Sequence, residues 1–168
     1  MAQTWREAWL KKLLKPIELA EWAKQRRAEG KRIATLNGSF DLLHAGHLHI
    51  VYEAKQQADL LLVALNSDSS VRRYKSPSRP IIPLEQRLEL MAAIGFIDFV
   101  TWFDEEDPRQ LLSIVRPDVH VNGAEYGLDC IEAAQVQQGG GRLHLVGKLE
   151  GLSTSAIVAK VQQLKEGA

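Results

Sequence analysis

Residues 37–49 read NGSFDLLHAGHLH and place three histidines within six positions. His44 and His47 should lie at the beginning of a helix, where free backbone N–H groups and the helix dipole favour an anion. Each imidazole can donate a hydrogen bond or carry a positive charge. Gly38 lets the backbone approach a ligand closely, and Asp41 lies beside the same turn. The pair therefore indicates a phosphate-binding site.

A zinc site made of His44, His47 and His49 is the competing interpretation. Residues two apart on a helix point in different directions, so His47 and His49 cannot easily share one ion. No cysteine or carboxylate nearby has the spacing that would complete such a site. We therefore expect no metal held by protein side chains and interpret His49 as a helix-surface residue. His120 and His144 alternate with apolar neighbours, which is typical of satisfied histidines on a sheet face.

A second helix beginning carries hydroxyl groups. Ser153, Thr154 and Ser155 follow Gly151 in GLSTSAI and combine hydroxyls with free backbone N–H groups. Taken by itself, this segment would be better explained as an ordinary helix N-cap. The segment follows the last expected strand, on the same edge of the sheet as the histidine turn, which favours a second phosphate contact.

Five cations cluster after the second expected strand. In a chain with 21 basic and 21 acidic residues, this cluster suggests a clamp for a polyanion. Its members are Arg72, Arg73, Lys75, Arg79 and Arg87.

Apolar strands alternate with helices along the chain and must position these groups. This order predicts an α/β fold with a doubly wound five-stranded parallel sheet, whose ligand site lies at the carboxyl ends of the strands. The expected strands are 32–36, 59–67, 98–103, 118–123 and 141–147. The expected helices are 45–57, 84–94, one beginning at 107–108, 129–138 and one from 153 nearly to the end, with a polar loop over 68–83.

Residues 1–29 are predicted to form an N-terminal helical extension broken at Pro16, ahead of a domain over residues 30–168. A basic amphipathic helix can also bind a membrane or a partner, but this extension is expected to pack on its own domain or to form a homodimer surface. A length of 168 residues suits one compact domain.

Composition narrows the class of protein. The balanced charge gives no support for a nucleic-acid or membrane-surface partner. The single cysteine, Cys130, rules out an internal disulfide, and the sequence shows no signal-peptide pattern or apolar stretch long enough to cross a bilayer. These features predict a soluble cytoplasmic protein.

Several motifs together resemble the HxGH nucleotidyltransferase superfamily. HAGH at 44–47 and LSTS at 152–155 carry the general likeness. GKRIATLNGSFDLLHAGH, VALNSD, SRPIIPLEQR and VNGAEY are similar to the bacterial D-glycero-D-manno-heptose 1-phosphate adenylyltransferases. This resemblance covers roughly residues 19–161.

The resemblance implies a Rossmann-like enzyme that transfers AMP from ATP to a heptose 1-phosphate. It implies Mg²⁺ on the nucleotide phosphates, carried mostly by phosphate oxygens and water. Catalytic roles fall on His44, His47 and Lys75. Nucleotide binding falls on Asn37, Gly38, Ser39, Phe40, Asp41, Gly46, Arg87, Asn122, Gly123, Ser153, Thr154 and Ser155, with Asp41 ordering the first loop or a ligand hydroxyl.

Two departures accompany the resemblance. Relatives commonly carry lysine at the position of Asn122, and many carry threonine at that of Ser155. The domain is often fused to a sugar kinase, for which this chain has no room, so a separate kinase is expected to supply the substrate.

Two alternatives stay open at this point. KLEGLSTS at 148–155 is also similar to cytidylyltransferases that act on glycerol 3-phosphate, with Lys148 in place of arginine. A non-catalytic nucleotide-binding module is the other alternative.

Overall fold

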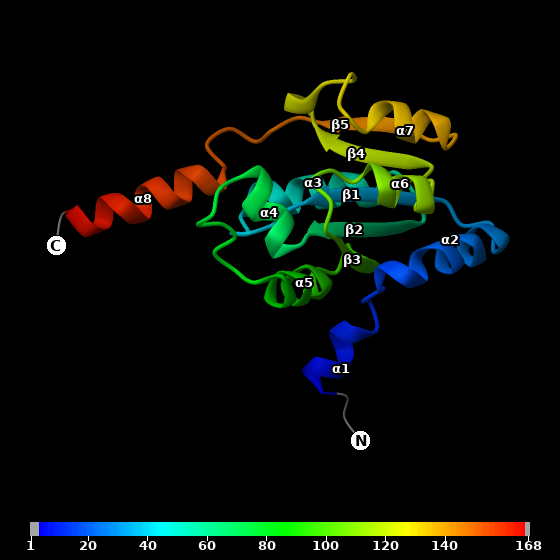
Figure 1. Cartoon of the computed structure of the whole chain (residues 1–168), viewed down its shortest axis with the longest axis horizontal. Coiled ribbons are helices and arrows are strands. Elements are labelled where there is room, and N and C mark those ends of the chain that lie inside the picture. The colour runs from blue at the N-terminus through cyan, green and yellow to red at the C-terminus, as the bar shows by residue number, and fades with distance from the viewer. Residues whose placement is uncertain (1–3, 167–168) are drawn as a thin grey trace.

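The computed structural model describes residues 4–166 and contains one five-stranded sheet (Figure 1). Its strands are β1 (Ile33–Gly38), β2 (Leu60–Asn66), β3 (Phe99–Phe103), β4 (Val119–Gly123) and β5 (Arg142–Val146). All neighbours pair in parallel, in the order β3-β2-β1-β4-β5. The chain starts in the middle of the sheet at β1 and later returns to its other side at β4. The carboxyl ends of β1 and β4 therefore form the switch point where ligands bind in such sheets.

Helices cover both faces of the sheet. One core cluster joins the strands to α1 (Trp5–Leu10), α3 (Ala45–Lys55) and α5 (Leu84–Ala93). The other joins them to α2 (Leu19–Ala28), α6 (Arg109–Val115) and α7 (Ala133–Gln138). β2 is buried on both faces, which explains its nearly continuous apolar sequence. The predicted doubly wound fold is thus confirmed.

The N-terminal segment is part of this packing. Pro16 begins the short 3-10 helix η1 (Pro16–Glu18) and separates α1 from α2, as expected. Trp9 of α1 is buried in one core cluster, and Leu19, Trp22 and Ala23 of α2 are buried in the other.

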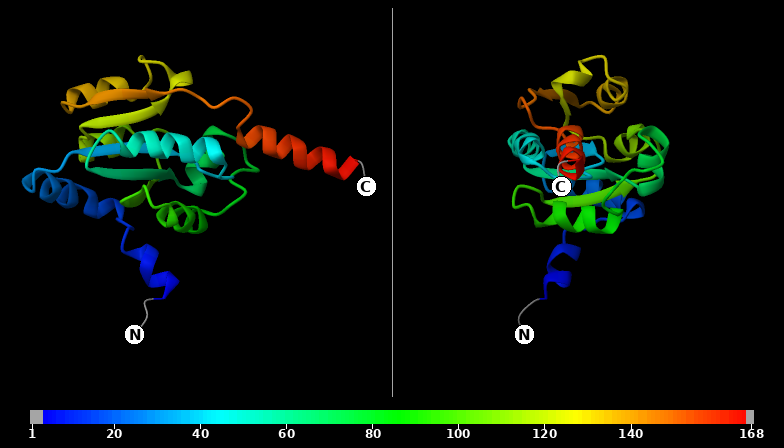
Figure 2. Two further views of the ribbon diagram at one scale, coloured as in Figure 1. Left: turned by 180° about the vertical axis from the view of Figure 1, so that it is seen from behind. Right: turned by 90° about the vertical axis from the view of Figure 1, so that its left-hand side faces the viewer.

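Two elements depart from the sequence-based prediction. Residues 68–74, expected as loop, form the helix α4 (Asp68–Tyr74), which the Ser67 side chain caps by accepting from the Ser70 N–H. The helix expected from residue 129 begins only at α7, because residues 128–132 form turns after η2 (Ala124–Tyr126). The final helix, α8 (Thr154–Glu166), projects away from the sheet (Figures 1 and 2).

No helix within residues 4–166 is long and apolar enough to cross a membrane.

Candidate active site

The beginning of α3 is built by His44 itself. Its Nδ1 accepts a hydrogen bond from the Gly46 N–H at 3.1 Å. The His44 N–H in turn donates to the His47 Nδ1 at 3.3 Å. A neutral imidazole that accepts at Nδ1 carries its proton at Nε2. Both rings therefore offer an Nε2–H donor to a ligand.

The two rings form a stacked pair. Their centroids are 3.9 Å apart with an interplanar angle of 29°. Phe40, buried and held at a positive φ of 46°, meets the His47 ring edge-on at 5.5 Å. This support fixes the orientation of the rings before any ligand arrives.

The surroundings keep both imidazoles neutral. Burial lowers the pKa of His47 to about 4, with the nearby charges of His44 and Lys75 acting in the same direction. Burial also lowers the pKa of His44, and Lys148 adds to this effect. At neutral pH the pair is therefore a set of hydrogen-bond donors without net charge.

Gly46 is required by the ring of His44. A Cβ at this position would lie 2.9 Å from His44 Cε1 and 3.0 Å from its Nδ1, too close for undisturbed packing. The same Cβ would lie 3.4 Å from the Cβ of Leu152, so the segment before α8 lies directly beside α3.

The beginning of α8 carries the predicted hydroxyls to this place. Ser153 Oγ accepts from the Ala156 N–H at 3.1 Å and so caps the helix. The Thr154 hydroxyl lies 3.5 Å from the Leu42 carbonyl oxygen, on the turn that leads to His44. Two helix beginnings that are about 110 residues apart in sequence therefore meet at one edge of the sheet.

A pocket of about 390 Å³ opens between them, which we call the edge pocket. Eight of the predicted residues line it: His44, Gly46, His47, Lys75, Gly123, Ser153, Thr154 and Ser155. Its remaining wall comes from His49, Ile50, Glu125, Tyr126, Val146, Gly147, Lys148, Leu149 and Leu152.

Two lysines supply the positive charge of the edge pocket. Lys75 follows α4 and donates from Nζ to Ser39 Oγ at 2.8 Å. Burial lowers its pKa, and Arg79 adds to this effect. A bound phosphate would compensate for this partial desolvation of the Lys75 side chain, which stays exposed at the pocket. Lys148 lies on the opposite segment, after β5.

The five-residue basic clamp is not formed. Arg87, predicted to neutralise phosphate charge, is 0% exposed and does not line the edge pocket. Its guanidinium donates to three carbonyl oxygens, those of Ser39, Asn66 and Ile82, and to the Asp68 carboxylate at 2.7 Å. This side chain holds β1, β2 and the segment before α5 together.

Two of the other arginines also form ion pairs within the chain. Arg79 pairs with the buried Asp41 at 2.9 Å, and Arg73 pairs with Asp104 at 3.6 Å. Arg72 is exposed on α4 and does not line the edge pocket. Only Lys75 of the five predicted cations reaches the pocket, because α4 and the carboxylates turn the others away.

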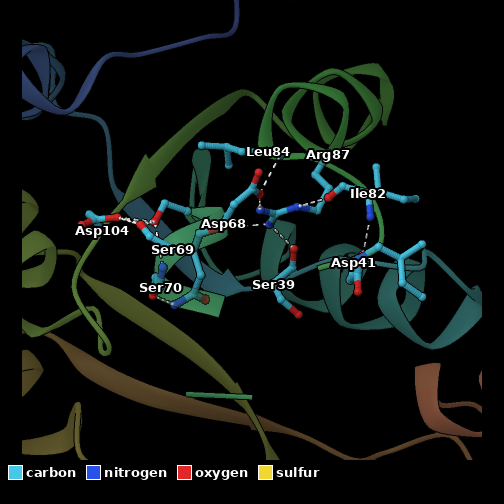
Figure 3. Close-up of polar contacts among 12 residues, drawn as sticks. Ser39, Asp41, Asp68, Ser69, Ser70, Ile82, Leu84, Arg87 and Asp104 are labelled. Carbon is cyan, nitrogen blue, oxygen red and sulfur yellow. Dashed lines mark hydrogen bonds and ion pairs between the residues drawn. The ribbon is translucent and has the colours of Figure 1, made fainter. Parts of the chain in front are cut away.

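Asp41 orders the loop that precedes α5. Its Oδ1 accepts from the N–H groups of Ile81 and Ile82 at 2.8 and 2.9 Å (Figure 3). Of the two roles expected for this residue, the geometry supports loop ordering.

The remaining predicted binding residues lie behind the pocket wall. Asn37 and Gly38 are the last residues of β1 and pair in register with β2. Ser39 and Phe40 are buried and contact Lys75 and His47. Ser39 and Phe40 therefore support lining side chains, and none of these four residues lines the pocket itself.

Asn122, predicted to bind nucleotide, also lies outside the edge pocket. It is buried at the end of β4, and its Nδ2 lies 3.4 Å from both Glu132 Oε2 and Cys130 Sγ. Strand alternation explains this placement, because Asn122 shares its face with His120, toward α6 and α7. His120 itself is bonded at Nδ1 to the Thr35 hydroxyl at 2.8 Å, while its buried Nε2 has no hydrogen-bond partner.

The prediction of site residues did not include nine residues of the wall, and four of these lie just after strands of the sheet. Glu125 and Tyr126 form η2 directly after β4, and Lys148 and Leu149 follow β5. Their positions in the sequence could have indicated this, since residues that follow β4 and β5 must lie at the same edge of the sheet as the histidine turn. His49, interpreted as a surface residue, lines the pocket as well.

Within residues 4–166, no group of three His, Cys, Asp or Glu side chains is arranged to hold a metal ion. The Nδ1 atoms of His44 and His47 are already occupied by backbone N–H groups, which disfavours the zinc interpretation.

Known proteins resemble this chain over most of its length. The family described as Cytidylyltransferase-like matches residues 35–165. The protein named "Bifunctional protein HldE" from Ectopseudomonas mendocina (strain ymp) is 44% identical over 81% of this chain and 29% of its own. The protein of the same name from Pseudomonas aeruginosa (strain LESB58) is 42% identical over 92% of this chain and 32% of its own. The chain thus spans less than a third of the length of these curated relatives.

A solved structure supports the fold. The lipopolysaccharide core biosynthesis protein from Thermoplasma volcanium GSS1 aligns with a TM-score of 0.57 and 27% identity, covering 71% of this chain and 98% of that one. Together with the family match over residues 35–165, this shows that the chain belongs to the cytidylyltransferase-like family and is a nucleotidyltransferase.

Proposed function

We propose that this chain transfers AMP from ATP to a heptose 1-phosphate, forming ADP-heptose and pyrophosphate for envelope polysaccharide synthesis. The observation that carries this proposal is the edge pocket, which lies between two helix beginnings. One helix beginning provides imidazole donors and the other provides hydroxyls. Family membership supports nucleotidyl transfer. The segments SRPIIPLEQR and VNGAEY support the heptose branch.

The reaction needs no protein nucleophile. An oxygen of the sugar phosphate attacks the α-phosphorus of ATP, and the bond from that phosphorus to the bridging oxygen breaks, so that pyrophosphate leaves with its electron pair. Charge builds on the equatorial and leaving oxygens. Donors already in place, namely the Nε2–H groups of His44 and His47, would stabilise this charge without reorganisation.

Lys75, Lys148 and the beginning of α8 would add to this stabilisation of the phosphate charge. Lys75 and Lys148 would neutralise the triphosphate from opposite walls, while the hydroxyls at Ser153–Ser155 would orient it. Rate enhancement would then come from alignment and electrostatic stabilisation.

Magnesium fits this pocket as an ion carried by the nucleotide. Glu125 is the one carboxylate on the described pocket wall, so phosphate oxygens and water would provide most ligands. The ion would add charge neutralisation on the phosphates when bound.

The proposed partners are ATP, a sugar 1-phosphate, a separate kinase that makes this phosphate, and a second copy of the chain. The cytoplasm, where ATP is available, is the proposed location.

The alternatives differ in nucleotide or in activity. Cytidylyl transfer to glycerol 3-phosphate would use the same phosphate site, and KLEGLSTS at 148–155 is the feature in its favour. A non-catalytic module would need no donors arranged around the phosphates, whereas His44 and His47 are held in one tautomer and supported by Phe40.

A pyrophosphate-release assay separates these functions. ATP and CTP are each paired with heptose 1-phosphate, glycerol 3-phosphate and pantetheine phosphate, in the presence of Mg²⁺. Turnover confined to ATP with heptose 1-phosphate is the expected result. Turnover with CTP and glycerol 3-phosphate would favour the cytidylyltransferase, and no release with any pair would favour the binding module.

A further inference from the structure

Two exposed tyrosines flank the carboxyl end of β1. Tyr74 is the last residue of α4, which follows β2, and it is 42% exposed. Tyr126 ends η2, which follows β4, and it is 65% exposed. Since β2 and β4 are the two neighbours of β1, the tyrosines lie on either side of the switch point (Figure 1). Burial raises the pKa of Tyr74, and Tyr126 is near enough to add to this effect.

The ring of Tyr74 lies beside the lysine that reaches the edge pocket. The Nζ atom of Lys75 is 5.5 Å from the centroid of this ring. Tyr52 and Phe96 are exposed to a similar degree, but they pack edge to face on each other at 5.1 Å. Tyr74 therefore offers aromatic surface next to a site that binds phosphate in the proposed reaction.

The groups around Tyr74 leave its hydroxyl able to donate. Lys75 Nζ donates to Ser39 Oγ at 2.8 Å, so Ser39 still has its own proton to give. Burial raises the pKa of Tyr74, whereas a hydrogen bond with the Ser39 hydroxyl lowers it. A phenol oxygen that accepts from Ser39 keeps its O–H for a ligand. Because the pKa is raised overall, this proton stays on Tyr74 at neutral pH.

The edge pocket leaves little room for a second substrate. Its volume of about 390 Å³ lies near the lower end of the range for a site that holds one small molecule. ATP would take most of this space, with its phosphates between His44, His47 and the beginning of α8. The acceptor must approach the α-phosphorus roughly in line with the leaving pyrophosphate. The side of Lys75 that faces Tyr74 is the direction this leaves open.

We propose that Tyr74 selects the acceptor: its O–H donates to a hydroxyl group of the sugar 1-phosphate and its ring covers one face of the sugar, while Lys75 meets the phosphate. A sugar ring presents C–H groups on its faces and hydroxyls at its edge, and a tyrosine combines an apolar face with a polar end. Glycerol 3-phosphate has no ring to cover this surface. The inference rests on the proposed function, because it assumes a sugar phosphate as the acceptor.

Steady-state kinetics of Tyr74→Phe test the donor. This substitution removes only the hydroxyl group and should raise the KM for heptose 1-phosphate about fivefold. The KM for ATP and kcat should stay within about twofold of wild type, because the lost bond is made with the acceptor alone. Tyr74→Ala also removes the ring and should raise the KM for heptose 1-phosphate roughly 20-fold.

Tyr52→Phe is the matched control, since Tyr52 is 45% exposed and lies on α3 against Phe96. It should leave both KM values unchanged. Thermal melting checks that each variant is folded, and a merely structural role for Tyr74 would lower Tm without separating the two KM values. An unchanged KM for heptose 1-phosphate in Tyr74→Phe, or an equal rise in both KM values, would overturn the inference.

Deoxy analogues identify the group that Tyr74 contacts. Calorimetry measures the binding of heptose 1-phosphate and of its singly deoxygenated analogues, with Mg²⁺ and a non-hydrolysable ATP analogue present. Wild type should bind one analogue about fivefold more weakly than the parent sugar. Tyr74→Phe should bind that analogue and the parent equally, because the bond is already lost. If every analogue loses as much affinity in the variant as in wild type, Tyr74 does not donate to the sugar.

The same titrations separate this inference from the proposed function. Turnover of ATP with heptose 1-phosphate, combined with wild-type sugar affinity in Tyr74→Phe, would refute the inference while the function stands. Sugar phosphate binding that depends on Tyr74, without pyrophosphate release, would refute the function while the inference stands. A wild type that does not bind heptose 1-phosphate would refute both.

Discussion

His44 combines two roles that one pair of substitutions can separate. Its Nδ1 accepts from the Gly46 N–H at 3.1 Å and caps α3, while we propose that its Nε2–H donates to the nucleotide. Asparagine places an amide oxygen close to the position of Nδ1 but has no atom at the position of Nε2. His44→Asn should therefore keep the cap and lose the donor, whereas His44→Ala should lose both.

The expected magnitudes differ for the two measurements. Losing a helix cap costs about 1 kcal/mol, which corresponds to a fall in Tm of roughly 2–4 °C for a domain of this size. Losing one preorganised donor costs about 100-fold in kcat. His44→Asn should thus melt within about 1 °C of wild type and turn over about 100-fold more slowly, while His44→Ala should show both losses.

Thermal melting and a pyrophosphate-release assay at saturating ATP give the two readouts. Near-normal turnover of His44→Asn would refute the assignment of Nε2–H to charge stabilisation. Equal loss of Tm in both variants would refute the capping role of Nδ1.

Three further predictions concern stability and the metal ion. Arg87→Met should lower the free energy of unfolding by about 3 kcal/mol, because it removes the buried donor of three carbonyls and leaves Asp68 with only the Leu84 N–H. In urea titrations exposed Arg72→Met is the control, and a loss no greater than in that control would contradict this. Unfolded His120 binds a proton near pH 6.5, whereas burial lowers its pKa to about 4 in the folded chain; stability should therefore fall by about 3 kcal/mol as pH drops across this range. Melting against pH measures it, and a His120→Leu variant with an unchanged acid slope would count against the assignment. EDTA should abolish pyrophosphate release and excess Mg²⁺ should restore it, so full turnover in EDTA would exclude the ion from the reaction.

The fold could be predicted because its signals are local. Apolar runs such as residues 60–66 and the glycine-containing turns mark strands and their ends, and parallel strands place those ends on one edge. The meeting of the His44 turn with Ser153–Ser155 followed from this topology. The short helix α4 was missed because its polar sequence, DSSVRRY, lacks an apolar stripe long enough to detect.

The roles of single charged residues could not be predicted in the same way. Both Arg87 and Lys75 are cations that follow β2 in the sequence. Carbonyl oxygens enclose Arg87, whereas Lys75 lines the pocket. Which cation is enclosed depends on partners such as Asp68 and Asp41, and their side-chain directions are set only after packing. Strand alternation could have indicated that Asn122 faces away from the pocket, since it shares a face with His120.

The central claim is that both helix beginnings hold one triphosphate. A crystal structure with Mg²⁺ and a non-hydrolysable ATP analogue tests it most directly. The phosphates should lie within hydrogen-bonding distance of Nε2 of His44 and His47 on one side and of the Ser153–Ser155 segment on the other. A nucleotide bound outside this pocket, or phosphates that touch only one of the two helix beginnings, would contradict the account.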